Sequence, residues 1–500
     1  MRASRFVFSM LFKFLIGLAI TLLLRHYAFP VFYAINMLSI VAIAYIVISK
    51  NSPYSIAWVI IIFLLPVYGL FLYLVFGKLD RTGRRSKKIR SLKQKGAQVQ
   101  VLYKDPEVYA NFSNIHPYRK RIAGYLGRKD QPLYDRTKCQ YYPLGDSYFE
   151  AMLEDMEQAK RFIFLEYFIL KDGELWSQIK DVLKRKASQG IEVRLMIDDI
   201  GCILSVTKEM MKELKAANIQ VVRFNDVHGF ISRYYFNFRN HQKITVIDGN
   251  IGYTGGSNLA DEYINTYPKL GHWKDNGIRL EGDAVWSLTV TFLQMWDGET
   301  QTNPDYESFR PNISCEGQGF YQPFTDGPTN DFDNIAKNIY KSFIHNAKSY
   351  VYITTPYLVI DDTLIDSLRL AAKGGTDVRI IVPKIWDKWF VHMVTLSNYR
   401  ALLEAGVRIY EYTPGFIHAK TIISDDDHAV IGTINMDYRS FYLHYENGVW
   451  ICGAPVIEDI KKDMLDVFEV SEEIQLEEWM QRPLHEKFIQ NVFRLFAIMF

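Results

Sequence analysis

Two stretches of this sequence carry the same pattern: HQKITVIDGNIGYTGGSN at residues 241–258 and HAKTIISDDDHAVIGTIN at residues 418–435. The repeated residues are His241, Lys243, Asp248, Gly255 and Asn258 in the first stretch and His418, Lys420, Asp425, Gly432 and Asn435 in the second. A pattern of five residue types that recurs at identical spacing is far too specific for chance. The chain therefore contains an internal duplication.

The sequence that precedes each stretch repeats as well. GIEVRLMID at 190–198 matches GTDVRIIVP at 375–383, and helical stretches lie between such apolar strands. This alternation predicts an α/β fold with largely parallel sheets that are covered on both faces. We therefore expect two similar α/β domains, at 136–310 and 311–475, that face each other in a pseudo-twofold arrangement.

Strand geometry explains the spacing of the repeated residues. Side chains alternate along a strand, so a His and a Lys two residues apart point to the same face. DGN or DDD then forms a hairpin turn, and the returning strand brings Gly and Asn back beside the His. Gly255 and Gly432 are expected to leave room for the backbone and the Asn amide to approach an anionic oxygen. Each copy thus offers an imidazole, a positive charge and a neutral donor.

Two such copies around one phosphate suit a double displacement on a phosphodiester. One imidazole attacks phosphorus to form a phosphohistidine, while the other protonates the leaving alkoxide and later deprotonates the incoming alcohol. Lysines and asparagines stabilise the extra negative charge of the transition state, a task that other enzymes give to metals. Neither a carboxylate cluster with metal-ligand spacing nor a CxxC pair occurs near these residues. We therefore expect no catalytic metal and no cofactor.

These arguments define the candidate site. The candidate catalytic residues are His241, Lys243, Asp248, His418, Lys420 and Asp425, and the residues expected to bind the substrate phosphate are Asn258 and Asn435. The two aspartates complete the pattern, but their odd offset from the lysines turns them away from the phosphate face. We expect these aspartates to stabilise the turn.

Each reactive histidine also needs a partner that orients its other ring nitrogen. For His241 we predict Asp275 of HWKDN, and for His418 we predict Glu446 of HYENG, each from the same half of the chain as its histidine. The alternative is that these carboxylates lie on the surface. Further candidates to line the pocket, which in the alternative belong to the core or to salt bridges, are Tyr167, Tyr357 and Arg439.

The N-terminal part of the chain has the composition of a membrane anchor, which we assign to residues 1–77. Residues 29–49 and 57–77 contain no charged residue, and each is long enough to cross a hydrocarbon layer about 30 Å thick. We predict a transmembrane helix in each range. Lys13 interrupts residues 6–24, which either span the membrane or lie in its interface as an amphipathic segment.

A basic run follows the second predicted span, in a juxtamembrane linker that we assign to residues 78–135. Between residues 78 and 95, nine lysines and arginines are opposed by one aspartate. This run is expected to stay in the cytoplasm together with everything after it, and it also suits contact with anionic lipid head groups. Because the whole chain carries +2, a run of +8 leaves −6 for the remainder, which argues against a nucleic acid substrate.

Residues 476–500 form a separate C-terminal tail in this interpretation. The last part, FIQNVFRLFAIMF at 488–500, places apolar residues on one helical stripe with Lys487 and Arg494 beside it. Such an amphipathic helix either lies in the membrane interface, where it would seat the site on the bilayer, or packs on the catalytic domains.

With these residues the sequence resembles the phospholipase D superfamily and, within it, the bacterial cardiolipin synthases. The two H-x-K-(x)4-D-(x)6-G-x-x-N motifs define the superfamily. The narrower resemblance rests on TGGSNLADEYI (254–264), WKDNGIRLEGDAVWSL (273–288), FTDGP (324–328), TPYLVIDD (355–362), NMDYRSFYLHYENG (435–448) and the apolar sequence at 51–77. It covers nearly the whole chain from residue 29, apart from residues 80–135. One departure is Gly256, where members of the superfamily often have Ser.

The resemblance implies two phospholipase D-like domains and a phosphatidyltransferase that converts two phosphatidylglycerol molecules into cardiolipin and free glycerol. It also implies a multi-pass protein of the bacterial cell membrane, with phospholipids as its partners and the catalytic domains on the cytoplasmic side. By resemblance, His241 would form the phosphatidyl-enzyme and His418 would act as acid and base, although the near symmetry of the motifs leaves this assignment open. A homo-oligomer is compatible with the sequence.

Several other functions remain open at this point. The same residues would serve a phospholipase D that hydrolyses lipids, another phosphatidyltransferase of the same superfamily, or a nuclease, which the predicted spans disfavour. A protein of another class, a catalytically silent lipid-binding scaffold, is disfavoured because His, Lys and Asn are intact in both halves.

Overall fold

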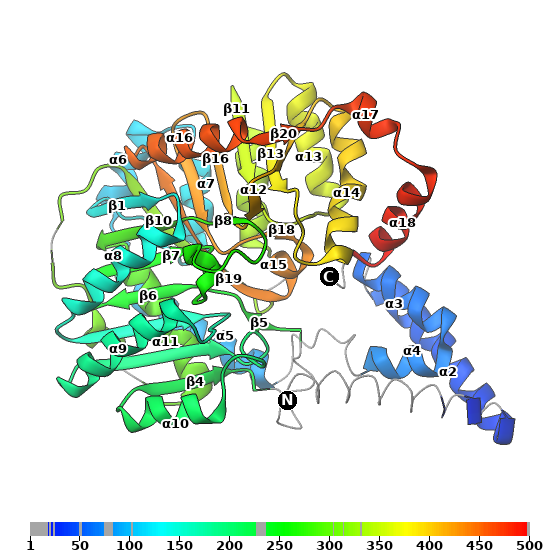
Figure 1. Ribbon diagram of the computed structural model, residues 1–500, viewed down its shortest axis with the longest axis horizontal. Coiled ribbons are helices and arrows are strands. Elements are labelled where there is room, and N and C mark those ends of the chain that lie inside the picture. The colour runs from blue at the N-terminus through cyan, green and yellow to red at the C-terminus, as the bar shows by residue number, and fades with distance from the viewer. Residues whose placement is uncertain are drawn as a thin grey trace.

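The two sequence repeats form two β-sheets with the same topology in the computed structural model of the chain (Figure 1). The structure describes residues 19, 22–23, 26–49, 53–74, 84–101, 104–226, 237–303, 305–313, 315–330 and 333–497. The strand order is β1-β9-β7-β6-β2-β3-β4 in the first sheet and β10-β19-β17-β16-β11-β13-β14, followed by β20, in the second. Strands at the same place in the two orders come from corresponding parts of the repeat, so the predicted duplication is confirmed.

The bounds of the strands follow the predicted apolar runs. The first sheet consists of β1 (Thr137–Tyr142), β2 (Phe162–Tyr167), β3 (Glu192–Asp198), β4 (Gln220–Phe224), β6 (Ile244–Ile247), β7 (Ile251–Gly255) and β9 (Gly277–Gly282). The second consists of β10 (Phe320–Asp326), β11 (Tyr350–Thr354), β13 (Asp377–Pro383), β14 (Arg408–Tyr412), β16 (Thr421–Ser424), β17 (His428–Gly432), β19 (His444–Cys452) and β20 (Ser471–Glu473).

Both sheets are mixed, which corrects the prediction of largely parallel sheets. β2, β3 and β4 run parallel, as do β11, β13 and β14, and a helix crosses between each parallel pair. Apart from β5 (Arg239–Asn240), which pairs in parallel with β19, the other neighbours within the two sheets are antiparallel. The reason lies in the repeated motifs, since each forms a hairpin (β6–β7 or β16–β17), and strands joined by so short a turn must be antiparallel.

Helices cover the outer face of each sheet. On the first sheet these are α8 (Gly145–Glu157), α9 (Glu174–Ser188) and α10 (Lys208–Ala216), and on the second α12 (Ile335–Asn346), α13 (Asp362–Lys373) and α14 (Trp389–Leu403). The amphipathic pattern of these helices buries one side of each against its sheet. The two sets again correspond in chain order, as the duplication requires.

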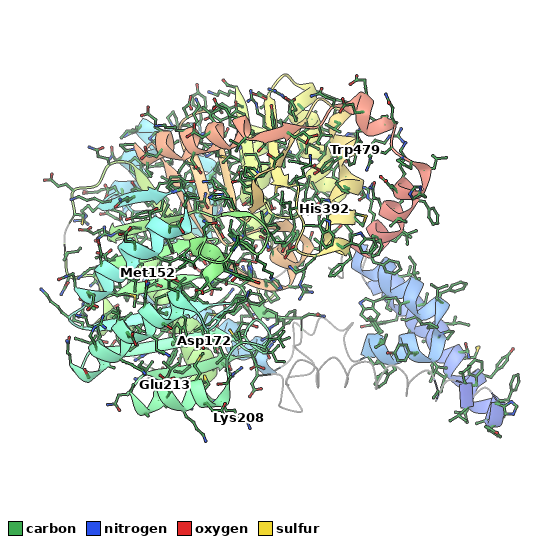
Figure 2. The ribbon with its side chains drawn as sticks, viewed as in Figure 1. Met152, Asp172, Lys208, Glu213, His392 and Trp479 are labelled. Carbon is green, nitrogen blue, oxygen red and sulfur yellow. The ribbon has the colours of Figure 1, made fainter. Side chains whose placement is uncertain are left out.

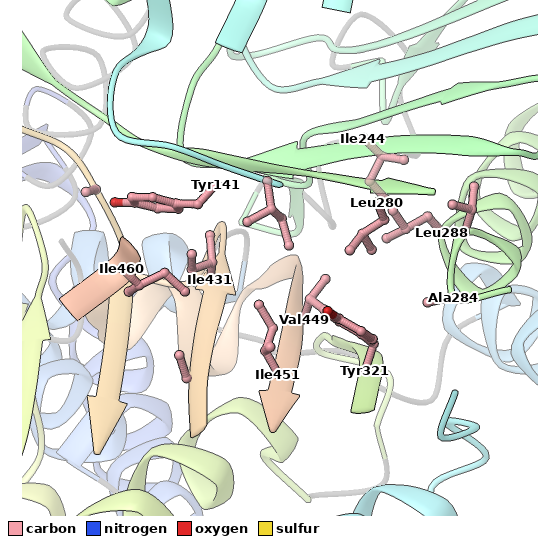
Figure 3. Packing of buried hydrophobic residues seen from close by; sticks show 14 of the residues in the cluster. Tyr141, Ile244, Leu280, Ala284, Leu288, Tyr321, Ile431, Val449, Ile451 and Ile460 are labelled. Carbon is pink, nitrogen blue, oxygen red and sulfur yellow. The ribbon is translucent and has the colours of Figure 1, made fainter. Parts of the chain in front are cut away.

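The inner faces of the two sheets meet in a shared apolar core (Figure 3). Ile244 and Leu280 of the first sheet belong to one buried cluster with Ile431, Val449 and Ile451 of the second. Two further helices, α11 (Val285–Thr300) and α16 (Val456–Glu469), also contribute to this core. Because this core is continuous across both sheets, the two halves form one folded body.

The N-terminal helices agree with the predicted anchor only in part. Among the described residues one helix, α2 (Phe29–Ser49), is long and apolar enough to cross a membrane, over Phe29–Val47. The single helix predicted at 57–77 is wrong, because α3 (Pro53–Leu64) ends before Pro66, where α4 (Pro66–Leu72) begins. Proline lacks the backbone N–H that a continuous helix needs and clashes with the preceding turn.

Two other parts of the predicted N-terminal region cannot be compared with the structure. The segment 6–24, with its two alternatives, lies almost entirely outside the described residues, and so do residues 75–83 at the start of the basic run.

Within the anchor, Ile46 of α2 packs with Trp58 and Ile62 of α3 and with Tyr73. The three helices α2, α3 and α4 therefore form one packed unit at one end of the molecule (Figure 1).

The segment that was expected to be a linker forms part of the folded body. It contains α5 (Arg84–Val101), which packs on α11, followed by α6 (Pro106–Ile115) and α7 (Lys120–Arg128). Phe112 of α6 is fully buried and lies edge-on to Phe320 (5.0 Å between ring centroids) and Trp450 (5.7 Å). The predicted linker at 78–135 is thus wrong for residues 105–133, whose apolar side chains belong to the core of the second half.

We predict that Phe112→Ala lowers the free energy of unfolding by about 3–5 kcal/mol, because it leaves a cavity in a close-packed core. The control is Ile115→Ala on the same helix, where the side chain is 57% exposed and the expected change is within about 0.5 kcal/mol. Urea unfolding of the purified protein in detergent micelles measures both. Equal effects of the two substitutions would show that α6 does not pack on the second half.

Candidate active site

His241 and His418 each follow a short strand that pairs with the opposite half of the chain. β5 (Arg239–Asn240) runs parallel to the start of β19, and the backbone N–H of His241 donates to the carbonyl oxygen of Tyr445 (2.9 Å). Reciprocally, β15 (Gly415–Ile417) runs parallel to β8 (His272–Lys274), and the N–H of His418 donates to the carbonyl oxygen of Lys274 (2.7 Å). Glu446 follows Tyr445, and Asp275 follows Lys274. Each histidine therefore lies beside a carboxylate of the other half.

The two histidines and the two predicted carboxylates form crossed pairs. Nδ1 of His241 lies 3.0 Å from both oxygens of Glu446, and Nδ1 of His418 lies 2.6 Å from Oδ2 of Asp275. All four side chains are buried. The predicted pairing within each half is therefore wrong, although both carboxylates do contact a histidine. The reason is the strand exchange, which sequence spacing does not reveal.

The surroundings of Glu446 differ from those of Asp275. Glu446 accepts hydrogen bonds from the hydroxyl of Ser440 on α15 (Tyr438–Tyr442; 2.7 Å) and from the hydroxyl of Thr433. Burial raises the pKa of Glu446, whereas the Lys243 ammonium and these two hydroxyl donors act to lower it. Because its hydrogen-bond partners are donors, Glu446 serves as an acceptor that orients His241.

Asp275 is held by the backbone instead. Its Oδ1 accepts a hydrogen bond from the N–H of Asn276 (2.9 Å). A Cβ atom at Gly256 would lie 2.1 Å from this oxygen, so a side chain there would require the Asp275 carboxylate to shift. Burial acts to raise the pKa of Asp275, but the charges of Lys420 and His418 prevail and lower it.

The two lysines are buried and fix the backbone of their own histidines. Nζ of Lys243 donates to the carbonyl oxygen of His241 (2.7 Å), and Nζ of Lys420 donates to that of His418. Burial lowers the pKa of Lys243 to about 7 and that of Lys420 to about 8, although Glu446 and Asp275 oppose the change. An anion that enters this site therefore meets ammonium groups that have lost most of their hydration.

Both imidazoles are neutral at neutral pH. Burial lowers the pKa of His418 to about 4, with Lys420 adding to the effect and Asp275 opposing it. Burial also places the pKa of His241 well below its usual value, helped by Lys243 and by Lys420 and His418 of the other half. This mutual influence shows that both halves contribute to one cluster of charges.

The side chains of the two asparagines differ in their contacts. Asn258 accepts a hydrogen bond from the N–H of Ile169 (3.0 Å) and donates to the hydroxyl of Tyr263 (2.8 Å). Oδ1 of Asn435 is buried without a hydrogen-bond partner among the described residues. A phosphate that is to contact the amide of Asn258 must therefore compete with Tyr263.

Gly255 and Gly432 have a different task from the one predicted. A Cβ atom at Gly255 would lie 2.4 Å from the carbonyl oxygen of Asn276, and one at Gly432 would lie 2.3 Å from that of Asn447. Both glycines thus allow their strands to approach the neighbouring strand β9 or β19, and not a bound anion.

Asp248 and Asp425 stabilise turns, as their offset indicates. Oδ1 of Asp248 accepts from the N–H groups of Arg161 (2.7 Å) and Phe162 (3.0 Å), and Asp425 accepts from those of Lys348, Ser349 and Tyr350. Both aspartates adopt positive φ angles (56° and 55°) at their hairpin turns. They contact the start of the adjacent β2 or β11 and do not contact the histidines.

The three residues considered for the pocket have different places. Tyr167 belongs to the core, where its hydroxyl pairs with that of Thr245 (2.8 Å). The hydroxyl of Tyr357 donates to Asp387 (2.6 Å) beside the site. Arg439 lies at the site, where its Nε donates to Nε2 of His444 (3.1 Å).

Sequence reasoning missed His444. Its ring lies 5.4 Å from that of His241, and its Nδ1 lies 3.6 Å from Oε1 of Glu446. Because Arg439 donates to Nε2, neutral His444 carries its proton on Nδ1, which has no hydrogen-bond partner among the described residues. The signal was available, since His444 precedes Glu446 by two residues and so shares its strand face. The corresponding ring beside His418 is Trp273 (5.8 Å).

A group with metal-ligand spacing exists at the same place. One ligand atom each of His241, His444 and Glu446 lie within 4.8 Å of one another. The donor set does not fit an ion well, because the proton on Nδ1 of His444 and the hydrogen bond from His241 to Glu446 occupy the ligand atoms. An ion there would displace the contact that orients His241.

Comparison with known proteins identifies relatives over most of the chain. A family model described as cardiolipin synthase, PLD-like domain, matches residues 152–295 and 340–468, and one described as Phospholipase_D-nuclease N-terminal matches residues 37–78. The chain is 35% identical to cardiolipin synthase 2 of Bacillus anthracis over 90% of this chain and 87% of the relative. It is 34% identical to a cardiolipin synthase of Geobacillus kaustophilus over 92% of each chain.

The chain also resembles a further relative and a solved structure. An uncharacterized protein of Streptococcus mutans is 38% identical over 91% of this chain and 99% of the relative. Among solved structures, phosphatidylserine synthase of Haemophilus influenzae superposes with a TM-score of 0.59 at 15% identity, and the match covers 77% of this chain and all of that one. This structural likeness supports the fold of two mixed α/β halves.

We predict that thermodynamic coupling follows the crossed pairs. A double-mutant cycle of His241→Gln with Glu446→Gln should give a coupling energy of about 1–3 kcal/mol, because these side chains share a buried hydrogen bond. The matched cycle of His241→Gln with Asp275→Asn should give a smaller coupling energy, because the Asp275 carboxylate pairs with His418 and no direct hydrogen bond joins it to His241. Urea unfolding in micelles provides all the values. Coupling of His241 to Asp275 and not to Glu446 would contradict the crossed arrangement.

Proposed function

Because the chain belongs to the cardiolipin synthase family of the phospholipase D superfamily, we propose that its two histidines transfer a phosphatidyl group from one phosphatidylglycerol molecule to another. The products are cardiolipin and glycerol. The observation that carries this proposal is the crossed pairing, in which each Nδ1 is held by a carboxylate of the opposite half. Nε2 of each imidazole is then the nitrogen that reacts with a lipid phosphate.

The first half of the reaction forms a covalent intermediate. Nε2 of His241 attacks phosphorus, the bond from phosphorus to the glycerol head group breaks, and the phosphatidyl group remains on His241. His418 gives its Nε2 proton to the glycerol oxygen as this oxygen leaves. The negative phosphodiester favours the protonated form of His418 when it binds, and the ionised Asp275 stabilises that form further.

The second half reverses the roles. A hydroxyl of the head group of a second phosphatidylglycerol attacks phosphorus, His418 takes its proton, and the bond between phosphorus and Nε2 of His241 breaks. Lys243 and Lys420 would stabilise the negative charge that develops on the phosphoryl oxygens, together with Asn258 and Asn435. Burial makes each of these contacts stronger than it would be in water.

The two halves suit different roles. His418 faces the ionised Asp275, whose pKa is lowered, whereas the carboxylate that faces His241 is shared with two hydroxyl donors. The raised pKa of Glu446 and its hydrogen bonds from Thr433 and Ser440 leave less negative charge to stabilise a protonated His241. His241 thus remains neutral as a nucleophile requires, and His418 is the better carrier of a proton.

We predict that His241→Ala and His418→Ala each lower turnover by at least about 10³-fold, because a single site needs both imidazoles. The substrate is phosphatidylglycerol in vesicles, and mass spectrometry should find cardiolipin and glycerol in equal amounts from the unmodified protein. The control is His345→Ala on α12, whose ring bonds to Ser367 away from the site.

Two outcomes would contradict this proposal in different ways. Substantial turnover by either histidine variant would show that the halves act independently. Phosphatidic acid as the main product of the unmodified protein would show a hydrolase, although the two-histidine mechanism would stand.

The anchor is proposed to be multi-pass. It would comprise residues 1–77, with α2 as one span and α3 and α4 together as a second, interrupted one. The catalytic halves, which follow the basic run at 78–95, would lie on the cytoplasmic side. They would comprise residues 136–310 and 311–475, the second completed by α6 and α7.

We predict that the C-terminal tail is protected from protease in intact cells and is cleaved after lysis, because the basic run keeps all later residues in the cytoplasm. An epitope after Phe500 reports the cleavage. As a control, an epitope placed before Met1 tests whether the number of spans is even. Cleavage of the C-terminal epitope in intact cells would overturn the proposed topology.

A further inference from the structure

The C-terminal helix α18 (Leu484–Leu495) packs one side on the body and leaves the other exposed. Phe493 and Ala497 join a cluster with Val391 and Val394 near the start of α14 and with Val359. The opposite side carries a stripe of exposed apolar side chains at helical spacing, namely Leu484 (83% exposed), Phe488 (70%), Val492 (36%) and Leu495 (54%). Four apolar residues on one exposed helix face are more than single surface residues require.

Two tryptophans extend this stripe. The chain between β13 and α14 carries Trp386, and α14 begins with Trp389, with 47% and 44% of their surfaces exposed. The ring of Trp389 lies edge-on to Phe493 of α18 (5.1 Å between ring centroids). We call Trp386, Trp389, Leu484, Phe488, Val492 and Leu495 the apolar rim.

The apolar rim borders the active site. Lys388, which precedes Trp389, donates to the hydroxyl of Tyr357 (2.7 Å), and this hydroxyl donates to Asp387 (2.6 Å). Asp387 is close enough to His418 for the two to affect each other electrostatically, and Lys388 acts on Lys420 in the same way. The segment that carries the tryptophans therefore also reaches the reacting groups.

We propose that the apolar rim inserts into the interface of the bilayer that α2 enters, so that lipid head groups pass from this interface directly to His241 and His418. The proposal rests on the proposed function, because lipids are the substrates that such a surface would admit. It goes beyond the tail alone, since Trp386 and Trp389 flank Asp387 and Lys388, which lie beside the site.

Two observations select a bilayer as the occupant. α18 and the helices α2–α4 lie toward the same end of the longest axis of the molecule (Figure 1). In Figure 2 the labelled His392 of α14 and Trp479 of α17 (Leu476–Met480) lie in the half of the body nearer to this end. Tryptophan is also the residue type that favours the level of the head groups, whereas Leu, Val and Phe favour the acyl region below it.

Electrostatic attraction contributes less than apolar burial. Two cations near the rim are paired, Lys388 with Asp387 (3.0 Å) and Arg494 with Asp362 (3.2 Å), and Nζ of Lys487 donates to the carbonyl oxygen of Met480 (2.7 Å). The side chains of Lys388 and Arg494 remain 49% and 40% exposed, so they can stay in water beside the head groups. The rim is therefore expected to insert into neutral as well as anionic bilayers.

The first test uses the fluorescence of the full-length protein in phosphatidylglycerol vesicles with brominated acyl chains. Bromine quenches tryptophan only at short range, so the unmodified protein should be quenched more than the Trp386→Phe/Trp389→Phe variant. Equal quenching of the two proteins would overturn the proposal and would leave another protein or a second copy of the chain as the occupant. This measurement needs no catalytic activity.

The second test compares two forms of the substrate. Phe488→Glu should lower kcat/KM about tenfold on phosphatidylglycerol in bilayers, while its activity on monomeric dihexanoyl phosphatidylglycerol stays within twofold of the unmodified protein. The matched control is Leu370→Glu on α13. Leu370 is 69% exposed. It lies near the end of α13, just before β13 begins, whereas the tryptophans of the rim follow the end of β13. Leu370 therefore lies toward the edge of the parallel strands that is opposite to the rim.

The outcomes separate the two proposals. Equal losses for Phe488→Glu and Leu370→Glu, or a loss by Phe488→Glu on both forms of substrate, would contradict a docking role for the rim. If the unmodified protein makes no cardiolipin from either form, the proposed function fails, whereas the fluorescence result still decides whether the rim inserts.

Discussion

Two buried hydrogen bonds between an imidazole and a carboxylate, each joining one half of the chain to the other, are the constraint on which the site depends. The backbone adds to them, because the N–H of His241 and that of His418 also donate across the boundary between the halves. Removal of any one partner would leave a buried polar or charged group without compensation, which costs several kcal/mol. Neither half can therefore orient its own histidine, and the duplicated domains must act as one unit.

The duplication supplies symmetrical groups, but group transfer needs asymmetry, since one imidazole must be neutral while the other carries a proton. The structure provides this asymmetry in the residues that surround the carboxylates. Thr433 and Ser440 donate to Glu446, whereas Asp275 accepts from the backbone beside Gly256. The absence of a Cβ atom at Gly256 lets the Asp275 carboxylate take its present place.

The features of the fold and the site that could be predicted are those that depend on residues close together in the sequence. The hairpins that carry the two motifs follow from alternation and turn residues, and the stabilising role of Asp248 follows from its odd offset. The pairing of Asp275 with His418 could not be predicted, because it depends on β8 and β15 meeting across the two halves. The burial of Phe112 is of the same kind, since its partners Phe320 and Trp450 lie hundreds of residues away. The break at Pro66, in contrast, could have been predicted from the sequence, because proline interrupts a helix. The apolar residues around Pro66 led instead to the prediction of one continuous helix.

The outcome of the reaction follows from access to the intermediate as much as from the reacting groups. A phosphohistidine can be attacked by any hydroxyl that reaches it, and water is always present at far higher concentration than a lipid. His241 and His418 keep only 6% and 7% of their surfaces exposed, and Lys243 and Lys420 keep 1%. The reacting groups are thus largely shielded from bulk water. If the site lies at the level of the head groups, the nearest hydroxyl is that of another lipid. The position of the site relative to the membrane, and not a different set of reacting residues, would then favour transfer over hydrolysis.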